Sequence, residues 1–237
     1  MRVSLARRVV AEYVGTAFLV AAVIGSGIMG DRLANGNVAL ALLANTVATG
    51  AALVALIIAF GPVSGAHLNP VVSLMDALEG GLPWAETPHY LAGQFLGGIT
   101  GAVAAHGMFG LSMISLSAHA RSGSAQVFSE FVATFGLMCV IWGASRHRSS
   151  AVPFAVGAYI TAAYWFTAST SFANPAVTIA RCLSDTFAGI RPRDVPWFVV
   201  AQLLGGFAAT LLFRWLVPGL PARAKDVLVA HGSASEN

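Results

Sequence analysis

Long apolar stretches follow one another along the chain, separated by short polar segments. Between Arg32 and Asp76 the only Asp, Glu, Lys, Arg or His is His67, and residues 149–180 contain none of these five residue types. A helix needs about 20 apolar residues to cross a bilayer, and intervals of this length accommodate such helices. The pattern therefore predicts an all-α membrane protein. Its six spans are expected over residues 9–29, 38–60, 87–109, 125–143, 151–168 and 195–216.

Two shorter apolar stretches follow Asn69 and Asn174. They have about ten residues each, which is too few to cross a bilayer, so they are predicted to be re-entrant half-helices. An Asn side chain accepts hydrogen bonds from the free N–H groups at a helix start, and Pro suits the first helical position. Asn69-Pro70 and Asn174-Pro175 are therefore expected to start two helices inside the membrane.

The second half of the chain repeats the first. Residues 12–16, 69–73 and 94–98 recur in the same order as residues 130–134, 174–178 and 202–206. Each half then holds three spans and one half-helix, and because three is odd the second copy is inverted in the membrane. Inverted repeats form a pathway at their interface, where broken helices meet near the midplane. We expect one channel domain over residues 1–237, with repeats at about 8–109 and 125–218.

Composition agrees with a membrane location and argues against other classes of protein. Hydrophobic residues make up 57% and charged residues 10% of the chain, against about 25% charged residues in a typical soluble domain. The net charge is +3, but the basic residues lie at span ends rather than in a cluster, so no nucleic acid partner is expected. Cys139 and Cys182 lie in separate apolar segments and form neither a metal-binding nor a disulfide pattern. We expect no metal, no cofactor and no enzyme activity.

The positions of Lys and Arg predict the orientation in the membrane. If both termini are cytoplasmic, eight basic residues lie on the cytoplasmic side and five lie outside. This excess predicts cytoplasmic termini. Residues 222–237 are polar and are expected to form a cytosolic tail.

The two predicted half-helix starts have a shared electrostatic consequence. A helix start carries a partial positive charge, and in inverted halves the starts at Asn69 and Asn174 face each other. A neutral solute there meets two amide donors, whereas a cation meets two positive ends and too few acceptors to replace its water. A single Asn-Pro pair is explained by helix capping alone. Two pairs, related by the repeat and set in apolar sequence, indicate a pore for small uncharged solutes.

The segments around these pairs resemble those of a known family. Ser64-Gly-Ala-His-Leu-Asn-Pro-Val71 and Ser171-Phe-Ala-Asn-Pro-Ala176 are similar to the paired signature of the aquaporins and aquaglyceroporins, the major intrinsic protein family. The resemblance extends over residues 8–218. It implies six tilted transmembrane helices with two half-helices, a pore in each subunit, and a homotetramer in the bilayer. The first motif ends in Val71, where the family mostly has Ala.

Glu12 and Glu130 place carboxylates inside two spans, at matching positions in the repeats. Carboxylates within a membrane are functional candidates, and an ion-coupled transporter would use them to carry protons. In the alternative interpretation, each accepts hydrogen bonds from the irregular backbone of a re-entrant loop. The family resemblance implies this scaffold role, which we favour. His67 is expected to stabilise the first loop or to edge the cytoplasmic mouth of the pore.

In the family, the narrowest ring of the pore uses four positions beyond the Asn-Pro pairs. By the family spacing, these positions are Thr49, Ala162, Ser171 and Val177 here. The family usually has Arg where this chain has Val177, and a water-selective ring combines bulk with a fixed cation. Four small or apolar side chains instead predict a wider opening with two hydroxyls. Arg181 lies one helical turn beyond Val177; it either reaches the outer vestibule or lies at the surface, and we favour the surface.

A small ring without arginine, together with Val71, resembles the aquaglyceroporins of bacterial arsenic-resistance operons. This resemblance implies passage of arsenite as neutral As(OH)3, with related trivalent metalloids, glycerol and some water as further cargo. It also implies a place in the cell's inner (cytoplasmic) membrane. A water-selective aquaporin is the alternative, because Val also occupies this position in some plant vacuolar members of the family.

Overall fold

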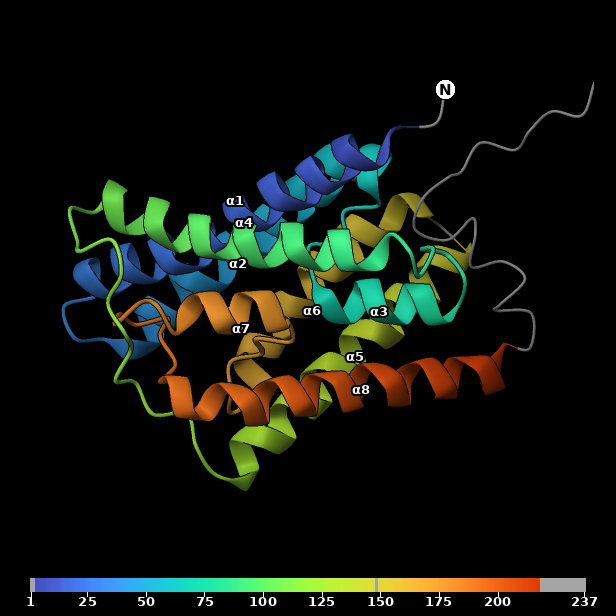
Figure 1. Cartoon of the computed structure of the whole chain (residues 1–237). Coiled ribbons are helices and arrows are strands. Elements are labelled where there is room, and N and C mark those ends of the chain that lie inside the picture. The colour runs from blue at the N-terminus through green and yellow to red at the C-terminus, as the bar shows by residue number, and fades with distance from the viewer. Residues whose placement is uncertain (1–2, 148, 218–237) are drawn as a thin grey trace, which may run out of the picture.

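The computed structural model describes residues 3–147 and 149–217, and within them the chain is helical, without strands. Figure 1 shows the arrangement of the helices. The long helices are α1 (Leu5–Leu33), α2 (Val38–Ser64), α4 (Thr87–Met108), α5 (Ser124–His147), α6 (Val152–Phe166) and α8 (Val195–Leu216). Two short helices, α3 (Pro70–Leu78) and α7 (Pro175–Arg181), and two 3-10 turns, η1 (Ser149–Ala151) and η2 (Pro192–Asp194), complete the described elements. The predicted tail, 222–237, lies outside the described residues.

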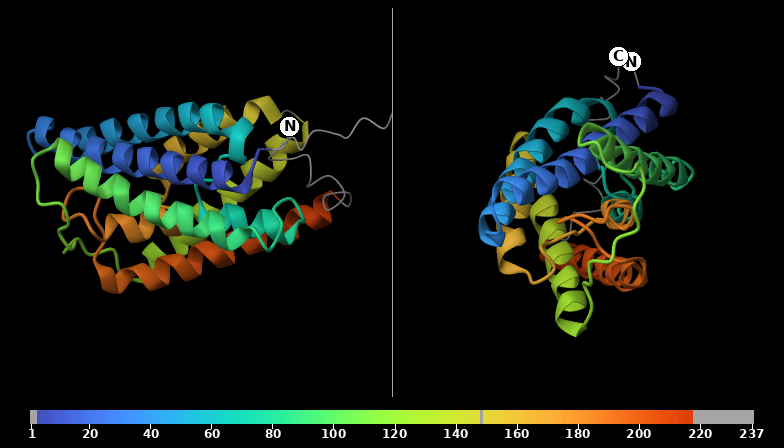
Figure 2. Two further views of the ribbon diagram at one scale, coloured as in Figure 1. Left: turned by 45° about the horizontal axis from the view of Figure 1, so that its top comes forward. Right: turned by 90° about the vertical axis from the view of Figure 1, so that its left-hand side faces the viewer.

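The long helices run side by side as a bundle (Figure 2). Four segments of the described chain are long and apolar enough to cross a bilayer by themselves: 5–33, 38–64, 124–145 and 192–216. Helix α4 packs along α1, and α6 packs along α2 and α5. The predicted span at 151–168 is slightly too long, because α6 begins at Val152 and ends at Phe166. The six predicted spans thus correspond to the six long helices.

Polarity is distributed in the opposite way to that of a soluble protein. Large apolar side chains face outward, including Phe18, Phe128 and Trp197, which are 62%, 66% and 64% exposed. The carboxylates of Glu12 and Glu130 are fully buried instead. A surface of large apolar side chains is stable in contact with lipid and unfavourable in contact with water. The protein is therefore a multi-pass membrane protein.

One glycine in each half allows two helices of that half to pack with their backbones in contact. A Cβ atom on Gly97 would overlap the backbone oxygen of Tyr13 across the α1–α4 contact. The repeat-related Gly205 stands in the same relation to the backbone oxygen of Phe131 across the α5–α8 contact. Small residues let membrane helices approach until their backbones touch, so these positions determine how closely the helices of each half pack.

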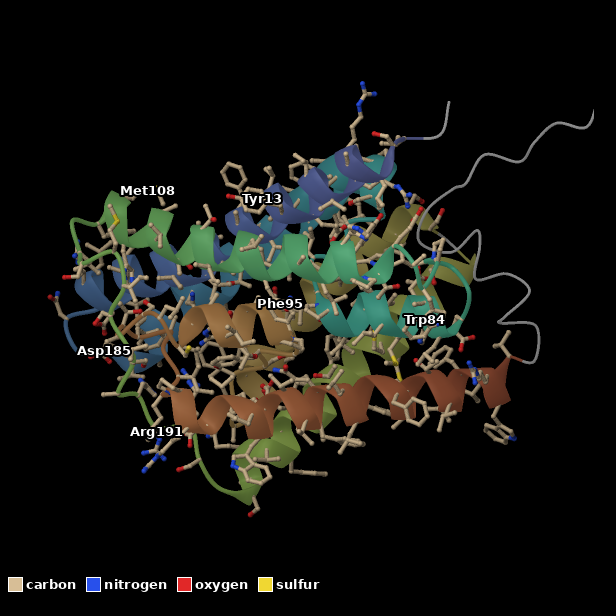
Figure 3. The ribbon with its side chains drawn as sticks, in the orientation of Figure 1. Tyr13, Trp84, Phe95, Met108, Asp185 and Arg191 are labelled. Carbon is tan, nitrogen blue, oxygen red and sulfur yellow. The ribbon has the colours of Figure 1, made fainter. Side chains whose placement is uncertain are left out.

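The bundle has two ends, each marked by labelled side chains. In Figure 3, Met108, Asp185 and Arg191 lie at one end and Trp84 lies at the other. We call these the Arg191 end and the Trp84 end. At the Arg191 end the loops are bonded to one another, for example from Ser117 N to Cys182 O (2.9 Å).

We expect Gly97→Ala to destabilise the protein by about 1–3 kcal/mol, because the new methyl group meets backbone that cannot move aside locally. Gly61→Ala in α2 is the matched control, since a Cβ atom there has open space around it. The measurement is the thermal midpoint of each variant in detergent, followed by tryptophan fluorescence. Equal midpoints for the two variants would contradict the close α1–α4 contact.

Candidate functional site

Asn69 and Asn174 join the two halves at the middle of the bundle. Each side-chain oxygen caps its own short helix, accepting from Val71 N at 2.9 Å and from Ala176 N at 3.0 Å, respectively. Each side-chain nitrogen donates across to the other half, Asn69 Nδ2 to Ala173 O and Asn174 Nδ2 to Leu68 O, both at 2.7 Å. An amide nitrogen has two hydrogens, so one N–H of each Asn is left for a solute.

The two short helices begin where the Asn-Pro pairs predict, with Asn69 and Asn174 as N-caps and Pro70 and Pro175 in the first turn. From this meeting point α3 runs toward the Trp84 end and α7 toward the Arg191 end (Figure 1). Both Asn side chains line one cavity inside the bundle. The partial positive charges of two helix starts therefore act on the same cavity.

Irregular backbone precedes each short helix. Ala66, Leu68, Ser171 and Ala173 all have φ between 47° and 49°, a left-handed conformation that is rare for residues other than glycine. Such residues cost about 1–3 kcal/mol each and persist only where the surroundings hold them. The hydrogen bonds to these two segments consequently maintain their conformation and thereby the positions of Asn69 and Asn174.

Glu12 holds the first segment. Its carboxylate accepts from Ser64 Oγ (2.6 Å), His67 N (2.9 Å), Leu68 N (2.7 Å) and Gln94 Nε2 (2.8 Å). The carboxylate is thereby fully occupied by protein donors.

Glu130 holds the second segment in the same manner. It accepts from Phe172 N (2.8 Å), Ala173 N (2.9 Å) and Gln202 Nε2 (2.6 Å). Neither this carboxylate nor that of Glu12 is among the groups that line the cavity. These contacts favour the scaffold interpretation of both residues over proton transport.

His67 reaches the cavity from the first segment. Its Nδ1 lies 3.0 Å from Ser73 Oγ and its Nε2 lies 3.6 Å from Asp76 Oδ2. It thus combines the two predicted positions, because it is bonded within the loop and also lines the cavity.

Thr49, Ser171 and Val177 line the cavity together with the Asn pair, but Ala162 does not. The prediction of Ala162 was wrong, since this residue is exposed on the outer face of α6. The inward face of α6 consists of residues four apart, 152, 156, 160 and 164, and a residue two positions away points to the opposite side of a helix. The fourth position is Tyr164, whose hydroxyl oxygen lies 3.2 Å from Thr49 Oγ1. This four-residue apolar period was the signal in the sequence that could have identified Tyr164.

Arg181 also departs from the prediction. The favoured surface position is wrong, because Arg181 is only 1% exposed and lines the cavity. Its Nε donates to Ala188 O, and its guanidinium carbon lies 3.3 Å from the centre of the Phe172 ring. The segment 182–194 folds back beside the end of α7 and buries the side chain. Such burial depends on long-range packing, which the spacing from Val177 does not reveal.

Ser171 has a further property that bears on solutes. It is 2% exposed, and its hydroxyl oxygen has no hydrogen-bond partner within the described part of the chain. A buried polar atom is normally hydrogen-bonded. Because Ser171 lines the cavity, its hydroxyl is free to bond to whatever passes through.

Val71 packs against the second half of the chain. A Cβ atom on Gly206 would overlap Cγ1 of Val71. The repeat-related Gly98 lies against Ala176, but there a Cβ atom would lie 3.1 Å from the backbone oxygen and would not meet the Ala176 side chain. The departure from Ala at position 71 is thus accommodated by a glycine on α8.

Comparisons with known proteins are consistent with this geometry. The family model described as major intrinsic protein matches residues 1–171 and 145–236. Aquaglyceroporin AqpS from Rhizobium meliloti is 55% identical over 219 residues, covering 92% of this chain and 93% of that protein. Probable aquaporin AqpM from Archaeoglobus fulgidus is 30% identical, covering 91% of this chain and 99% of its own length. The crystal structure of the aquaglyceroporin from Plasmodium falciparum shares the fold, with a TM-score of 0.71 and 20% identity over 92% of this chain and 100% of that one.

We expect Glu130→Ala to abolish folding or to destabilise the protein severely, because each buried donor left without an acceptor costs about 1–3 kcal/mol. Glu130→Gln, which keeps one acceptor oxygen, should be destabilised less and should still pass neutral solute at a rate independent of pH. Glu86→Gln, at a partly exposed partner of Arg8, is the control. Normal stability of Glu130→Ala combined with pH-dependent flux in the wild type would instead support proton transport.

Proposed function

The chain belongs to the major intrinsic protein family, whose members are channels and not enzymes, and on that premise we propose that it passes small uncharged polyhydroxy solutes passively, with arsenite as As(OH)3 and glycerol as its main cargo. Related trivalent metalloids and some water are further cargo. The observation that carries this proposal is Val177 on the cavity wall, at the position where the family usually places a cation.

The chemistry of the wall supports such cargo. Val177 offers an apolar surface, while Ser171 offers a hydroxyl that has no protein partner in the described residues. Further along, one N–H each of Asn69 and Asn174 is available. As(OH)3 and glycerol are neutral and carry three hydroxyl groups, each able to donate and to accept. A solute of this kind exchanges its water for these groups, whereas an ion meets the positive ends of two helices.

The alternative is a water-selective channel, and two residues favour it. Tyr164 brings an aromatic ring to the wall, so the cavity is less open than four small side chains would make it, and Arg181 adds a cation. We retain the broader cargo because Ser171 and Val177 contribute small and uncharged side chains to the same wall. The printed name of the relative AqpS, an aquaglyceroporin, agrees with this choice.

We further propose a homotetramer in the cell's inner membrane with both termini cytoplasmic. The excess of Lys and Arg at the predicted cytoplasmic ends supports the orientation. In that orientation the Trp84 end is cytoplasmic and the Arg191 end is outside.

Liposome swelling tests the cargo. We expect wild-type protein to pass water, glycerol and As(OH)3, and Val177→Arg to lower the rate for the two larger solutes about tenfold or more, equivalent to ~1.4 kcal/mol in the barrier. Water flow should be nearly unchanged. Val177→Thr, which keeps the size and adds no charge, is the control. Unchanged solute flux in Val177→Arg, at matched protein content, would remove Val177 from the restriction.

A second pair of variants tests the corrected position on α6. We expect Tyr164→Ala to widen the passage and to raise the rate for four- and five-carbon polyols relative to glycerol. Ala162→Phe should change neither rate, because this side chain is exposed on the outer face of α6. The reverse outcome would restore Ala162 to the pore wall.

A further inference from the structure

Arg181 is a buried cation that forms no ion pair with a carboxylate among the described residues. It is 1% exposed, and the arginine–carboxylate ion pairs of the described residues are Arg8–Glu86, Arg191–Asp194 and Arg214–Glu79. The protein acceptor that Arg181 does have in the described chain is the backbone oxygen of Ala188, bonded to Nε. The two terminal nitrogens have no such acceptor within residues 3–147 and 149–217, and the side chain lines the cavity. A charge in this position is solvated by the contents of the pore, and its field acts there.

Phe172 fixes the direction of this cation. The Arg181 guanidinium lies 3.3 Å from the centre of the Phe172 ring, an arrangement in which the ring attracts the charge. Phe172 itself is held by Glu130, which accepts from its backbone N–H, and by the edge-on ring of Phe198 at 5.2 Å. The side chain of Arg181 is thus held on the cavity wall by a buried and well-packed support.

Arg121 adds a second positive charge beside the same ring. Its guanidinium carbon lies 4.9 Å from the centre of Phe172, and its Nε and Nη1 donate to Gly189 O (2.8 Å) and Ser169 O (3.1 Å). Burial lowers the pKa of Arg121 to about 10, so it stays charged at neutral pH. Two buried carboxylates lie in this region: Glu130 accepts from backbone and Gln202 donors, and Asp194 is paired with Arg191 and accepts from Arg121 N. Two buried guanidinium groups therefore flank the Phe172 ring, and neither forms an ion pair with a carboxylate in the described part of the chain.

We propose that Arg181 is the outer barrier to cations in this pore, ahead of the two helix starts at the Asn pair and displaced one helical turn from the restriction at Val177, so that cations and large neutral solutes are excluded by different residues. This inference rests on the proposed function. A cleft with charge of one sign changes the local concentration of a permeating ion about tenfold or more. Cations are therefore excluded at Arg181 before they reach the Asn pair. Val177, Ser171 and Tyr164 select among neutral solutes.

Urea and guanidinium form a matched pair for the test, because they are alike in size and shape and differ in charge. Tracer flux into proteoliposomes is measured for both and for glycerol. Wild-type protein should pass urea and glycerol and exclude guanidinium. Arg181→Leu should raise guanidinium flux about tenfold or more and leave the ratio of urea to glycerol flux unchanged. Arg181→Lys should restore the exclusion, and Arg193→Leu, at an exposed arginine of η2, should behave as wild type.

The outcomes separate this inference from the proposed function. Guanidinium flux as low in Arg181→Leu as in wild type, with glycerol passing through both, would overturn the outer barrier to cations and leave the neutral-solute channel intact. Arg181→Gln keeps a donor for Ala188 O and replaces Arg181→Leu if that variant does not fold. Wild-type protein that passes guanidinium as fast as urea would overturn the inference without any variant. Absence of glycerol and As(OH)3 flux in wild type would contradict the proposed function itself.

Discussion

The structure depends on two carboxylates that supply acceptors where the membrane provides no water. Backbone N–H groups within a bilayer must be bonded by the protein itself, and the segments before α3 and α7 leave the helical pattern at this depth. Glu12 accepts four hydrogen bonds and Glu130 accepts three, two of each set coming from backbone N–H groups of these segments. A carboxylate has about four acceptor sites. It can therefore satisfy several donors at once, and it maintains the left-handed residues that aim Asn69 and Asn174 at one cavity.

Local features of the sequence predicted most of the fold and the centre of the site. The spans follow from apolar length, and the starts of α3 and α7 follow from Asn-Pro, because capping involves only neighbouring residues. The restriction was harder to predict. Ala162 was placed by counting back from Asn174 across the segment 167–174, whose path depends on Glu130 and on Arg121 rather than on its length. The helical period of α6 itself determines which of its residues face the cavity, and it places Tyr164 on the cavity wall.

The two halves are coupled by contacts that no single half specifies. Val71 belongs to the first motif, yet the space for its side chain is provided by Gly206 on α8. The hydrogen bonds of the Asn side chains also join the two halves, since Asn69 donates to Ala173 O and Asn174 donates to Leu68 O. Each half-helix is thus positioned by the opposite half. A change in one motif must be matched in the other half, which makes the pair of motifs a single structural unit.

Separating charge from size has a consequence for how such a pore can change its cargo. A channel that admits larger neutral solutes must widen, and a wider opening would ordinarily weaken exclusion of ions, whose leakage dissipates a potential worth about 2.3 kcal/mol per charge per 100 mV. If the barrier to cations lies at Arg181, fixed by Phe172 and Ala188, then position 177 can be small and apolar without loss of that barrier. On this proposal, the absence of Arg at position 177 means that the cation has moved outward by one turn, and the residues around Val177 are left free to select among neutral solutes.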